Sequence, residues 1–470
     1  MPATADLAAH PWFFCGIGGS GMLPLATILR GMGAEVAGSD RSFDQGRTPE
    51  KRAWLESQGF ALFPQDGSGV RSAKQTLVAS AAIEDTVPEV VRAAELGCPR
   101  MTRAELLAAL FNRPPGGIGI AGTSGKSTVT GMIGWILARE GRDPTIMNGA
   151  VMKNFVSPDV PFASARVGKG AFVSEVDESD GSIALYNPQV AVLLNVSLDH
   201  KGMDELRQLF GDFVRRAKSV AANFDDPEVR ELTFDCDDLA SYGIESPDAL
   251  IAVETDSIVE TPTSIAATVI RRPNDTYRLT LPMPGRHNLS NALAAIAGAH
   301  LAAVDVGASV EALSTFAGLA RRFDVIGTSP GGVTVIDDFG HNPEKCRATL
   351  RTLKAHPGRV IAFFQPHGYG PLRQMGHELA QTFAAELGPD DILLMCDPVY
   401  FGGTVDRSEG SERIVDLVRA GGGEALYIPS REACGERIVA LAQPGDRVVV
   451  MGARDDTLTA FAKDILAHLG

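Results

Sequence analysis

One short turn constrains this chain more than any other stretch: Ala121-Gly122-Thr123-Ser124-Gly125-Lys126-Ser127-Thr128. An apolar strand with Ile118 and Ile120 precedes it, and a helix with one apolar face follows (Met132, Ile133, Ile136 and Leu137). Backbone N–H groups at a helix N-terminus point towards an anion, Lys126 adds a positive charge and Ser127 offers a hydroxyl to Mg²⁺. The turn therefore predicts a nucleoside triphosphate site, in a shortened form because Ile120 stands where the full pattern has glycine.

Length, composition and charge limit the possible classes of protein. A chain of 470 residues with 44% hydrophobic residues is long enough for about three domains, each with its own core. The formal net charge of -15 argues against a nucleic acid or an anionic membrane surface as partner. The six cysteines are scattered without a C-x-x-C pair, and no run approaches the roughly 18 apolar residues of a membrane helix, so we expect a cytoplasmic protein.

A second glycine turn lies near the start of the chain. Gly16-Ile17-Gly18-Gly19-Ser20-Gly21 matches G-x-G-x-x-G, follows an apolar strand over 12–15 and precedes a helix that begins near Met22. Ser39 and Asp40 end the next strand, and Asp40 stands about 20 residues past the turn, where a ribose-binding carboxylate is expected. By itself this opening predicts an NAD-dependent oxidoreductase, or only a tight strand-to-helix turn. An NAD enzyme has no need of the second phosphate turn.

Alternating strand-like and helix-like runs predict an α/β protein of three domains. The cluster Arg113-Pro114-Pro115-Gly116-Gly117 is typical of a linker, so the first domain, with its Rossmann-like opening, covers residues 1–113. The central domain over 114–318 carries the triphosphate turn and is expected to contain a mainly parallel sheet. Residues 319–470 supply four more apolar strands with polar carboxyl ends, which indicate a third, Rossmann-like unit. Residues 234–278 form a strand-rich insertion without identifiable chemistry.

A carboxylate is expected beside the triphosphate turn. The strand over 171–176 carries Glu175 near its end, and a carboxylate at the end of a neighbouring strand is the usual companion of the Ser127 hydroxyl, because Mg²⁺ takes oxygen ligands. We therefore predict that Ser127 and Glu175 ligate Mg²⁺. The acidic turn that follows is equally consistent with a solvated loop (Asp177, Glu178 and Asp180).

Three further side chains have more than one interpretation. His200 lies just beyond the apolar strand 190–196, at the sheet edge where ligands bind, which favours a metal or phosphate role. Asn291 either caps a helix or hydrogen-bonds a purine edge, and spacing alone does not decide between these roles. Arg322 either clamps a phosphate or is an ordinary surface arginine.

An ordered set of motifs resembles one known family. The motifs are Gly16 to Met22, Gly38-Ser39-Asp40, Ala121 to Thr128, Glu175 to Ser182, Asn195 with Asp199-His200, His287-Asn288 with Asn291, Ala320 to Phe323, Asp337 to Pro343 and Gln365-Pro366-His367. They occur in the order seen in the Mur ligases and run over nearly the whole chain. The resemblance is strongest to the members that add the first amino acid of the peptidoglycan stem peptide.

This resemblance implies an activity and its substrates. In the family a Rossmann-like first domain holds the UDP end of the substrate, the central domain binds ATP with Mg²⁺, and the last domain closes over it. The ATP γ-phosphate activates the carboxylate of UDP-N-acetylmuramate as an acyl phosphate. The amino group of an amino acid then attacks it, and L-alanine is the acceptor expected first. The partners implied are these small molecules, with no nucleic acid and no membrane, and a monomer or homodimer is expected. The UDP contacts would be Gly16, Gly18, Gly19, Ser20, Gly21, Met22, Ser39 and Asp40.

The resemblance also implies roles for single residues. Lys126 corresponds to the lysine of the γ-phosphate, Arg322 to a residue near the transferring phosphoryl group, and His200 to a ligand of a second Mg²⁺. On the nucleotide and amino-acid sides the corresponding residues are Asn291 (adenine), Asp337 (ribose), and His341 and His367 (amino acid).

The chain departs from the family pattern near the expected acceptor site. Typical relatives read Pro-His-Arg-Tyr-x-Arg-Thr, whereas Gly368 and Pro371 replace both arginines here, and Arg373 is the candidate that compensates. If those arginines handle the incoming amino acid, the acceptor could differ from L-alanine. In the phosphate turn, Ser127 replaces the usual threonine and keeps the hydroxyl. Lys218 is the nearest candidate for the carbamoylated lysine of some Mur ligases, but its spacing does not fit.

Three alternatives to an amino-acid ligase remain at this point. A recycling ligase would join a whole peptide to the same sugar nucleotide. In an NAD-dependent oxidoreductase, neither Glu175 nor the turn over Ser124 to Thr128 would have a function. A non-catalytic nucleotide-binding regulator would have no need of Lys126, Glu175 and His200 together.

Overall fold

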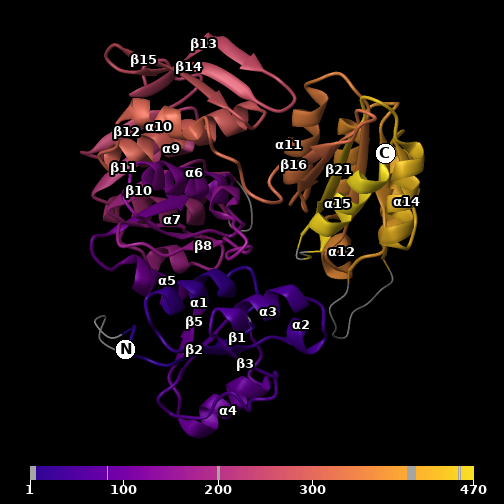
Figure 1. Ribbon diagram of the computed structural model, residues 1–470. Coiled ribbons are helices and arrows are strands. Elements are labelled where there is room, and N and C mark those ends of the chain that lie inside the picture. The colour runs from indigo at the N-terminus through magenta and orange to yellow at the C-terminus, as the bar shows by residue number, and fades with distance from the viewer. Residues whose placement is uncertain (1–6, 82, 198–201, 400–408, 454, 456) are drawn as a thin grey trace. The chain divides into compact units, whose positions relative to one another are not determined.

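The computed structural model describes residues 7–81, 83–197, 202–399, 409–453, 455 and 457–470. The chain forms two compact units. The first consists of Met1–Val259, Ile265–Pro282 and Arg286–Ala317, and the second of Glu260–Ser264, Met283–Gly285 and Gly318–Gly470. Three mainly parallel sheets with helices between their strands confirm the predicted α/β class (Figure 1).

The N-terminal sheet is wholly parallel and has the order β3-β2-β1-β4-β5. The central strand β1 is buried along its whole length, as expected for its apolar sequence Trp-Phe-Phe-Cys. The chain leaves β1 towards β2 on one side and later returns to β4 on the other, so the carboxyl end of β1 is a topological switch point. The elements are β1 Trp12–Cys15, α1 Met22–Gly31, β2 Val36–Ser39, α2 Arg41–Asp44, α3 Pro49–Ser57, β3 Ala61–Phe63, β4 Thr76–Ala79, α4 Pro88–Leu96, β5 Arg100–Thr102 and α5 Arg103–Phe111.

The central sheet contains ten strands in the order β15-β14-β13-β12-β11-β10-β6-β9-β7-β8. The strand β6, which leads into the triphosphate turn, lies between β10 and β9 and runs parallel to both. The predicted apolar face of the following helix, α6, is buried. The elements are β6 Gly117–Ala121, α6 Lys126–Arg139, β7 Thr145–Met147, η1 Lys153–Phe155, β8 Ala165–Arg166, β9 Phe172–Glu175, η2 Ser182–Leu185, β10 Val190–Leu193, α7 Met203–Arg216, β11 Ser219–Asn223, α8 Pro227–Leu232, β12 Leu239–Tyr242, β13 Ile251–Glu260, β14 Ile265–Arg271, β15 Asp275–Leu281, α9 Arg286–Leu301 and α10 Val306–Leu313.

The third sheet, in the second unit, has the order β16-β17-β21-β18-β19-β20. Only its edge strand β16 is antiparallel to its neighbour. The four predicted strands of this region are present as β17, β18, β19 and β21, whereas β16 and β20 were not predicted because they are short and half-exposed. The elements are β16 Asp324–Thr328, β17 Thr334–Asp338, α11 Pro343–Lys354, β18 Val360–Gln365, α12 Tyr369–Glu386, β19 Ile392–Met395, α13 Ser411–Ala420, β20 Glu424–Tyr427, α14 Arg431–Leu441, β21 Arg447–Gly452 and α15 Leu458–His468.

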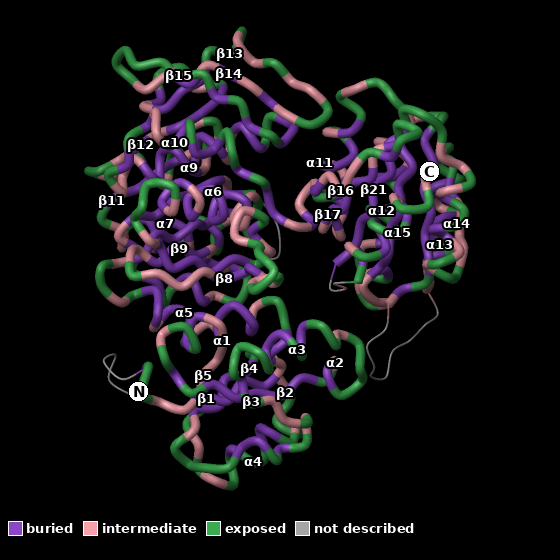
Figure 2. The backbone as a smooth tube through the Cα atoms, in the orientation of Figure 1, coloured by how far each residue is buried: buried purple, intermediate pink, exposed green. Residues whose placement is uncertain are grey.

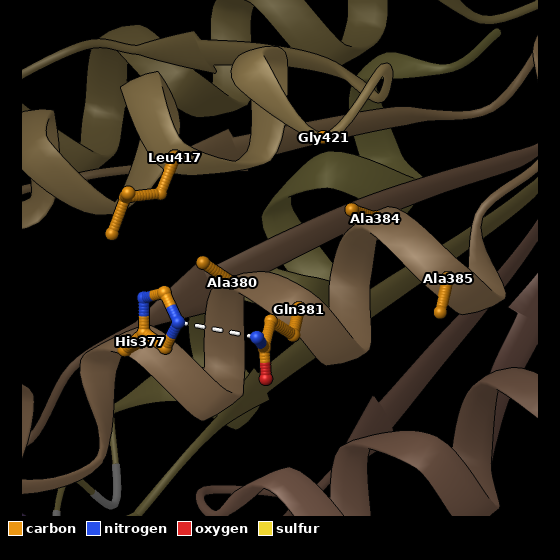
Figure 3. Close-up of a pocket in the computed structure, with 7 residues that line it drawn as sticks. All are labelled: His377, Ala380, Gln381, Ala384, Ala385, Leu417 and Gly421. Atoms are coloured by element: carbon orange, nitrogen blue, oxygen red, sulfur yellow. Dashed lines mark hydrogen bonds between the residues drawn. The ribbon is translucent and has the colours of Figure 1, made fainter.

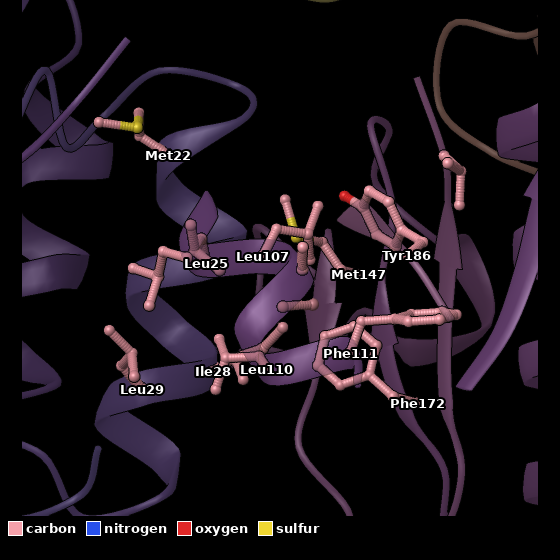
Figure 4. Packing of buried hydrophobic residues seen from close by; sticks show 14 of the residues in the cluster. Met22, Leu25, Ile28, Leu29, Leu107, Leu110, Phe111, Met147, Phe172 and Tyr186 are labelled. Carbon is pink, nitrogen blue, oxygen red and sulfur yellow. The ribbon is translucent and has the colours of Figure 1, made fainter. Parts of the chain in front are cut away.

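The N-terminal and central sheets share one apolar core, which passes across the predicted linker at 113/114 (Figure 4). The ring of Phe111, at the end of α5, lies 6.0 Å from the ring of Phe172 in β9 and 5.1 Å from that of Tyr186. The indole of Trp54 in α3 donates a hydrogen bond to the carbonyl of Asp159, at 2.9 Å. The proline-rich cluster therefore joins two sheets that are packed together.

Burial follows the sheets in both units, and the connecting loops carry most of the exposed backbone (Figure 2). The strands β18 and β21 are buried at every position. Within the described ranges, no helix is long and apolar enough to cross a membrane.

Candidate active site

The triphosphate turn is shaped by two glycines that other residues would replace only with backbone strain. Gly122 and Gly125 have φ angles of +139° and +86°, which side chains disfavour. A Cβ atom at Gly125 would lie 2.6 Å from the Oδ1 atom of Asn291. The helix α6 starts at Lys126, so its first N–H groups face the turn, as an anion site requires.

A hydroxyl and a carboxylate meet beside this turn. Ser127 Oγ donates a hydrogen bond to Glu175 Oε2 at 2.7 Å, because β6 and β9 are parallel neighbours. Ser127 lies at the start of α6, after the turn that follows β6, and Glu175 is the last residue of β9. A Cβ atom at Gly149 would lie 2.4 Å from Glu175 Oε1, so glycine there leaves room for the carboxylate. The two oxygen donors have the chemistry that Mg²⁺ prefers, and they fit the predicted metal site.

Lys126 is held by Glu178, for which the sequence allowed either a site role or a position in a solvated loop. Its Nζ atom donates to the carbonyl of Gly122 at 2.6 Å and forms an ion pair with Glu178 at 2.9 Å. The side chains of Lys126 and Glu178 are only 18% and 8% exposed, so the pair is shielded from water. Burial alone would raise the pKa of Asp177, but hydrogen bonds from Ser179 and the charge of Lys126 hold it below its usual range. Glu178, in the acidic turn, is therefore part of the site, whereas Asp180 is exposed.

Asn195, just beyond β10, fixes the middle of the turn. Its Oδ1 atom accepts a hydrogen bond from the Ser124 backbone N–H at 2.9 Å, and its Nδ2 atom donates to the Ser124 carbonyl at 3.2 Å. The Thr123 hydroxyl accepts from the N–H of Ser197 at 3.1 Å, and Thr128 is buried in the first turn of α6. The predicted ligand His200 lies outside the described residues.

Asn291 lies close to the triphosphate turn and is not a helix cap. The helix α9 begins at Arg286, so Asn291 stands inside it, and the cap interpretation is wrong. Packing of α9 against α6 brings Asn291 to the glycine of the turn, Gly125. Its amide donates to Asn288 Oδ1 at 3.5 Å. The position is compatible with a contact to a nucleotide bound at the turn.

The first glycine turn is closed by backbone hydrogen bonds and one carboxylate. The N–H groups of Gly16 and Ile17 both donate to the carbonyl of Ser39, at 2.8 and 3.0 Å. The Gly19 N–H donates to the carbonyl of Gly16, and Ser20 and Gly21 lead into α1, which starts at Met22. Asp40 accepts from the Gly18 N–H and from the Ser42 N–H, both at 2.8 Å. Asp40 thus holds the turn with Oδ2 and caps α2 with Oδ1.

Two buried charged residues near this turn were not found from the sequence. Lys51 Nζ donates to the carbonyl of Gly18 at 3.1 Å, and Glu89 accepts from the Ser39 hydroxyl at 2.8 Å. Glu89 is fully buried. Both lie in the first turn of a helix, where charged residues are common, so no sequence signal distinguishes them from surface residues.

In the second unit, Asp337 and Arg321 form a buried pair. Arg321 Nε lies 3.4 Å from Asp337 Oδ1, Thr459 donates to Asp337 Oδ2 at 2.6 Å, and the carbonyl of Gly452 accepts from Arg321 Nη2 at 2.6 Å. Burial raises the pKa of Asp337, and the nearby Arg321 opposes this. The ribose role of Asp337 stays a prediction.

Arg322, His341 and His367 gather around the carboxyl end of β17. The guanidinium of Arg322 lies 4.4 Å from the ring centre of Phe339, and the rings of His341 and His367 are 5.4 Å apart. The Nδ1–H of His341 donates to the carbonyl of Phe339 at 2.9 Å, because a carbonyl can only accept. Burial, with the charge of Lys345, lowers the pKa of His341 to about 4, so the imidazole is neutral near pH 7.

The segment that replaces the two family arginines starts α12. Gly368 precedes this helix with a φ angle of +144°, which an arginine would adopt only with strain. Pro371 stands in the first helical turn, where proline is tolerated, and Arg373 follows on the same helix. Further along, α12 and α13 enclose a hollow of about 270 Å³ lined by His377, Ala380, Gln381, Ala384, Ala385, Leu417 and Gly421 (Figure 3). None of the predicted site residues lines it.

A protein with this fold and this turn falls in the class of triphosphate-dependent α/β enzymes. Three family models match the chain: the Mur ligase family catalytic domain over residues 13–114, the Mur ligase middle domain over 120–299, and the Mur ligase glutamate ligase domain over 321–454. The chain belongs to the Mur ligase family and is an ATP-dependent carbon–nitrogen ligase. The first glycine turn therefore does not make it an NAD-dependent oxidoreductase.

Individual relatives agree with this family. UDP-N-acetylmuramate--L-alanine ligase of Synechococcus sp. (strain JA-3-3Ab) is 35% identical over 98% of this chain and 87% of its own length. The crystal structure of UDP-N-acetylmuramate-alanine ligase from Thermotoga maritima has a TM-score of 0.79 at 24% identity, covering 97% of this chain and 98% of that one. A murein peptide ligase from Psychrobacter arcticus has a TM-score of 0.72 at 24% identity, covering 98% and 99%. These two structures share the fold.

Proposed function

We propose that this chain joins an amino acid, L-alanine in the first place, to the carboxylate of UDP-N-acetylmuramate at the expense of ATP. The observation that carries the proposal is the 35% identity, over 98% of the chain, to a relative of that name. The reaction belongs to peptidoglycan synthesis. We place the enzyme in the cytoplasm, because its substrates are soluble nucleotides and its six cysteines are free, as expected in a reducing compartment.

The reaction has two steps. A carboxylate oxygen attacks the γ-phosphorus of ATP and expels ADP, which gives an acyl phosphate. The amino group, after loss of a proton, attacks the acyl carbon, forms the amide and expels phosphate. Because a carboxylate and a triphosphate repel each other, catalysis consists mainly of positioning and charge neutralisation.

Roles in the first step fall on the central sheet. Lys126 neutralises the γ-phosphate, and Ser127 and Glu175 would hold one Mg²⁺, with His200 as a ligand of a second. Bound Mg²⁺ would offset the negative charge of the phosphates. Lys126 exchanges Glu178 for the phosphates when ATP binds, since one ammonium group cannot pair fully with both. Asn291 contacts the adenine.

The remaining roles fall on the N-terminal sheet and on the sheet of the second unit. The first glycine turn and Asp40 hold the UDP end of the sugar nucleotide, with the turn's N–H groups facing the diphosphate. Residues 319–470 supply Asp337 for the ribose and Arg322 for the transferring phosphoryl group. The two histidines, His341 and His367, face the amino acid. In this proposal, 1–113, 114–318 and 319–470 act as substrate, ATP and acceptor domains.

The deciding experiment measures phosphate release from ATP with UDP-N-acetylmuramate and a panel of amino acids and peptides. We expect release that requires both the sugar nucleotide and an amine, with L-alanine as the best substrate. Release that is independent of the sugar nucleotide would refute the ligase proposal. Mass spectrometry of the product identifies the amide that forms.

A second candidate acceptor is a whole peptide or a different amino acid. The specific observation is the pair Gly368 and Pro371, which removes two arginines from the region expected to bind the amino acid. If a peptide is the natural acceptor, phosphate release in the same panel should be faster with the peptide than with L-alanine. Arg373→Met should raise the KM for the amino acid while leaving the KM for ATP unchanged. Unchanged kinetics would exclude Arg373 as the compensating residue, and the exposed Arg92→Met is the matched control.

A further inference from the structure

A small hollow lies at the junction of the N-terminal and central sheets, where no role has been assigned. It measures about 130 Å³, and its walls include Ile28, Met32, Leu110, Arg113, Lys169 and Phe172. It is formed by the last turns of α1 and the starting ends of β7 and β9, whereas both glycine turns follow the carboxyl ends of strands. The hollow is thus separate from the nucleotide sites.

Arg113 lines this hollow and carries an unsatisfied guanidinium N–H group. Its Nη1 atom is buried and has no hydrogen-bond partner among the described residues. A guanidinium group does not lose its proton, so the buried N–H groups need an acceptor. Lys169 adds a second positive charge to the wall, and none of the described lining residues is acidic. The charge of the hollow therefore favours an anion.

Four apolar side chains form much of the remaining wall, beside Thr145, and the small volume limits the size of that anion. Ile28 and Met32 come from α1, Leu110 from α5 and Phe172 from β9. A cavity of roughly 150 Å³ takes a ligand the size of benzene, so one of about 130 Å³ takes only a few non-hydrogen atoms. A nucleotide is too large. A planar carboxylate matches the two parallel N–H groups of a guanidinium better than a tetrahedral anion matches them.

We propose that this hollow binds a small aliphatic carboxylate. The acid group pairs with Arg113 and Lys169, and the short carbon chain lies against Ile28, Met32 and Leu110. The ligand would contact the N-terminal sheet's helices, the linker and the central sheet together, and so would stabilise this junction. The proposal does not depend on which amide the enzyme forms.

Acetate, propionate and butyrate are the probes, titrated into the full chain at constant ionic strength. The readouts are thermal unfolding and the NMR resonance of the Met32 methyl group, labelled with ¹³C and assigned with Met32→Leu. We expect a saturable shift of the Met32 methyl resonance and affinity that rises about three- to fourfold with each added methylene group. Inorganic phosphate should shift this resonance less than butyrate does.

Variants separate this site from other anion sites. Arg113→Met should abolish the butyrate-induced shift, and Arg113→Lys should weaken it, because lysine lacks the planar fork. Arg92→Met, on an exposed surface pair, should leave it unchanged. If Arg113→Met fails to fold, Lys169→Met, at an exposed position, serves as the second variant and should weaken binding. Two results would overturn the proposal. One is the absence of a Met32 shift in the wild type, which is expected if water alone fills the hollow. The other is a shift of equal size in the Arg113 or Lys169 variants that fold.

Discussion

The two glycine turns of the first unit have similar backbones and different charged neighbours. Each follows a buried parallel strand, contains a glycine of positive φ and leads into a helix, α1 or α6. The first is closed by the carboxylate of Asp40, with Lys51 at its backbone. The second carries its own lysine and a hydroxyl paired with Glu175. Glycines thus create room for an anion, and the side chains around them select which anion binds.

The lysines provide the strongest test of this difference. Lys126→Ala should abolish measurable phosphate release, a loss of at least about a thousandfold, because no other charge of the turn replaces it. The matched Lys51→Ala should raise the KM for the UDP-linked substrate and leave the KM for ATP unchanged. An active Lys126→Ala enzyme would mean that this turn is not the ATP site.

The second test of the difference between the turns concerns the predicted Mg²⁺ ligands Ser127 and Glu175, which only the triphosphate turn has. Glu175→Gln should raise the Mg²⁺ concentration needed for half-maximal activity by roughly 10- to 100-fold, since an amide is a weaker ligand than a carboxylate. Mn²⁺ binding measured by electron paramagnetic resonance in the presence of ADP checks the metal directly. Asp180→Asn, exposed in the same acidic stretch, is the control. Equal Mn²⁺ affinities for Glu175→Gln and the wild type would argue against Glu175 as a ligand.

A methyl group in the first turn should have a smaller and more selective effect. A Cβ atom at Gly18 would lie 2.8 Å from Phe43 Cζ and 3.0 Å from Asp40 Oδ2, so Gly18→Ala must shift the turn. We expect the KM for the UDP-linked substrate to rise about tenfold, roughly 1.4 kcal/mol of lost binding, with the KM for ATP unchanged. Gly331→Ala, where the new atom meets only ordinary contacts, is the control. A change in the KM for ATP instead would contradict the separation of the two turns.

The smallest expected effect is a gain in affinity. Glu178→Gln removes the charge that holds Lys126, so ATP should bind about fivefold more tightly, equivalent to roughly 1 kcal/mol. Isothermal titration with ATP measures the change. The gain should disappear when Lys126 is replaced by Met, because the two residues act as a pair. Weaker binding in Glu178→Gln would show that Glu178 supports the nucleotide.

Much of the fold was predictable because its elements have strong local patterns. The buried strand β1 was predicted with the bounds that the structure has, and α1 begins at Met22 as expected. Apolar runs in parallel sheets and glycine turns before a helix are signals that tertiary contacts rarely override. The edge strands β16 and β20 were missed, since short half-exposed strands depend on their neighbours for their conformation.

Site residues that belong to one local sequence motif were predictable, whereas contacts between segments distant in the sequence were harder to predict. Ser127 and Glu175 were paired correctly in space because β6 and β9 are parallel neighbours, whose carboxyl ends lie at one edge of the sheet. Glu178 was left undecided between a site residue and a solvated loop. Asn291 had the helix cap as an alternative, since spacing does not reveal where α9 begins.

The sequence by itself determined the α/β class, the two glycine turns and the ATP-dependent ligase family, because each depends on residues close together or on their order along the chain. Only the tertiary structure decided that Glu178 holds Lys126, that Asp40 closes the first turn, and that Arg113 lines a hollow between the N-terminal and central sheets. These contacts join segments far apart in the chain. Side-chain direction and burial, which set such contacts, arise only when the sheets pack together.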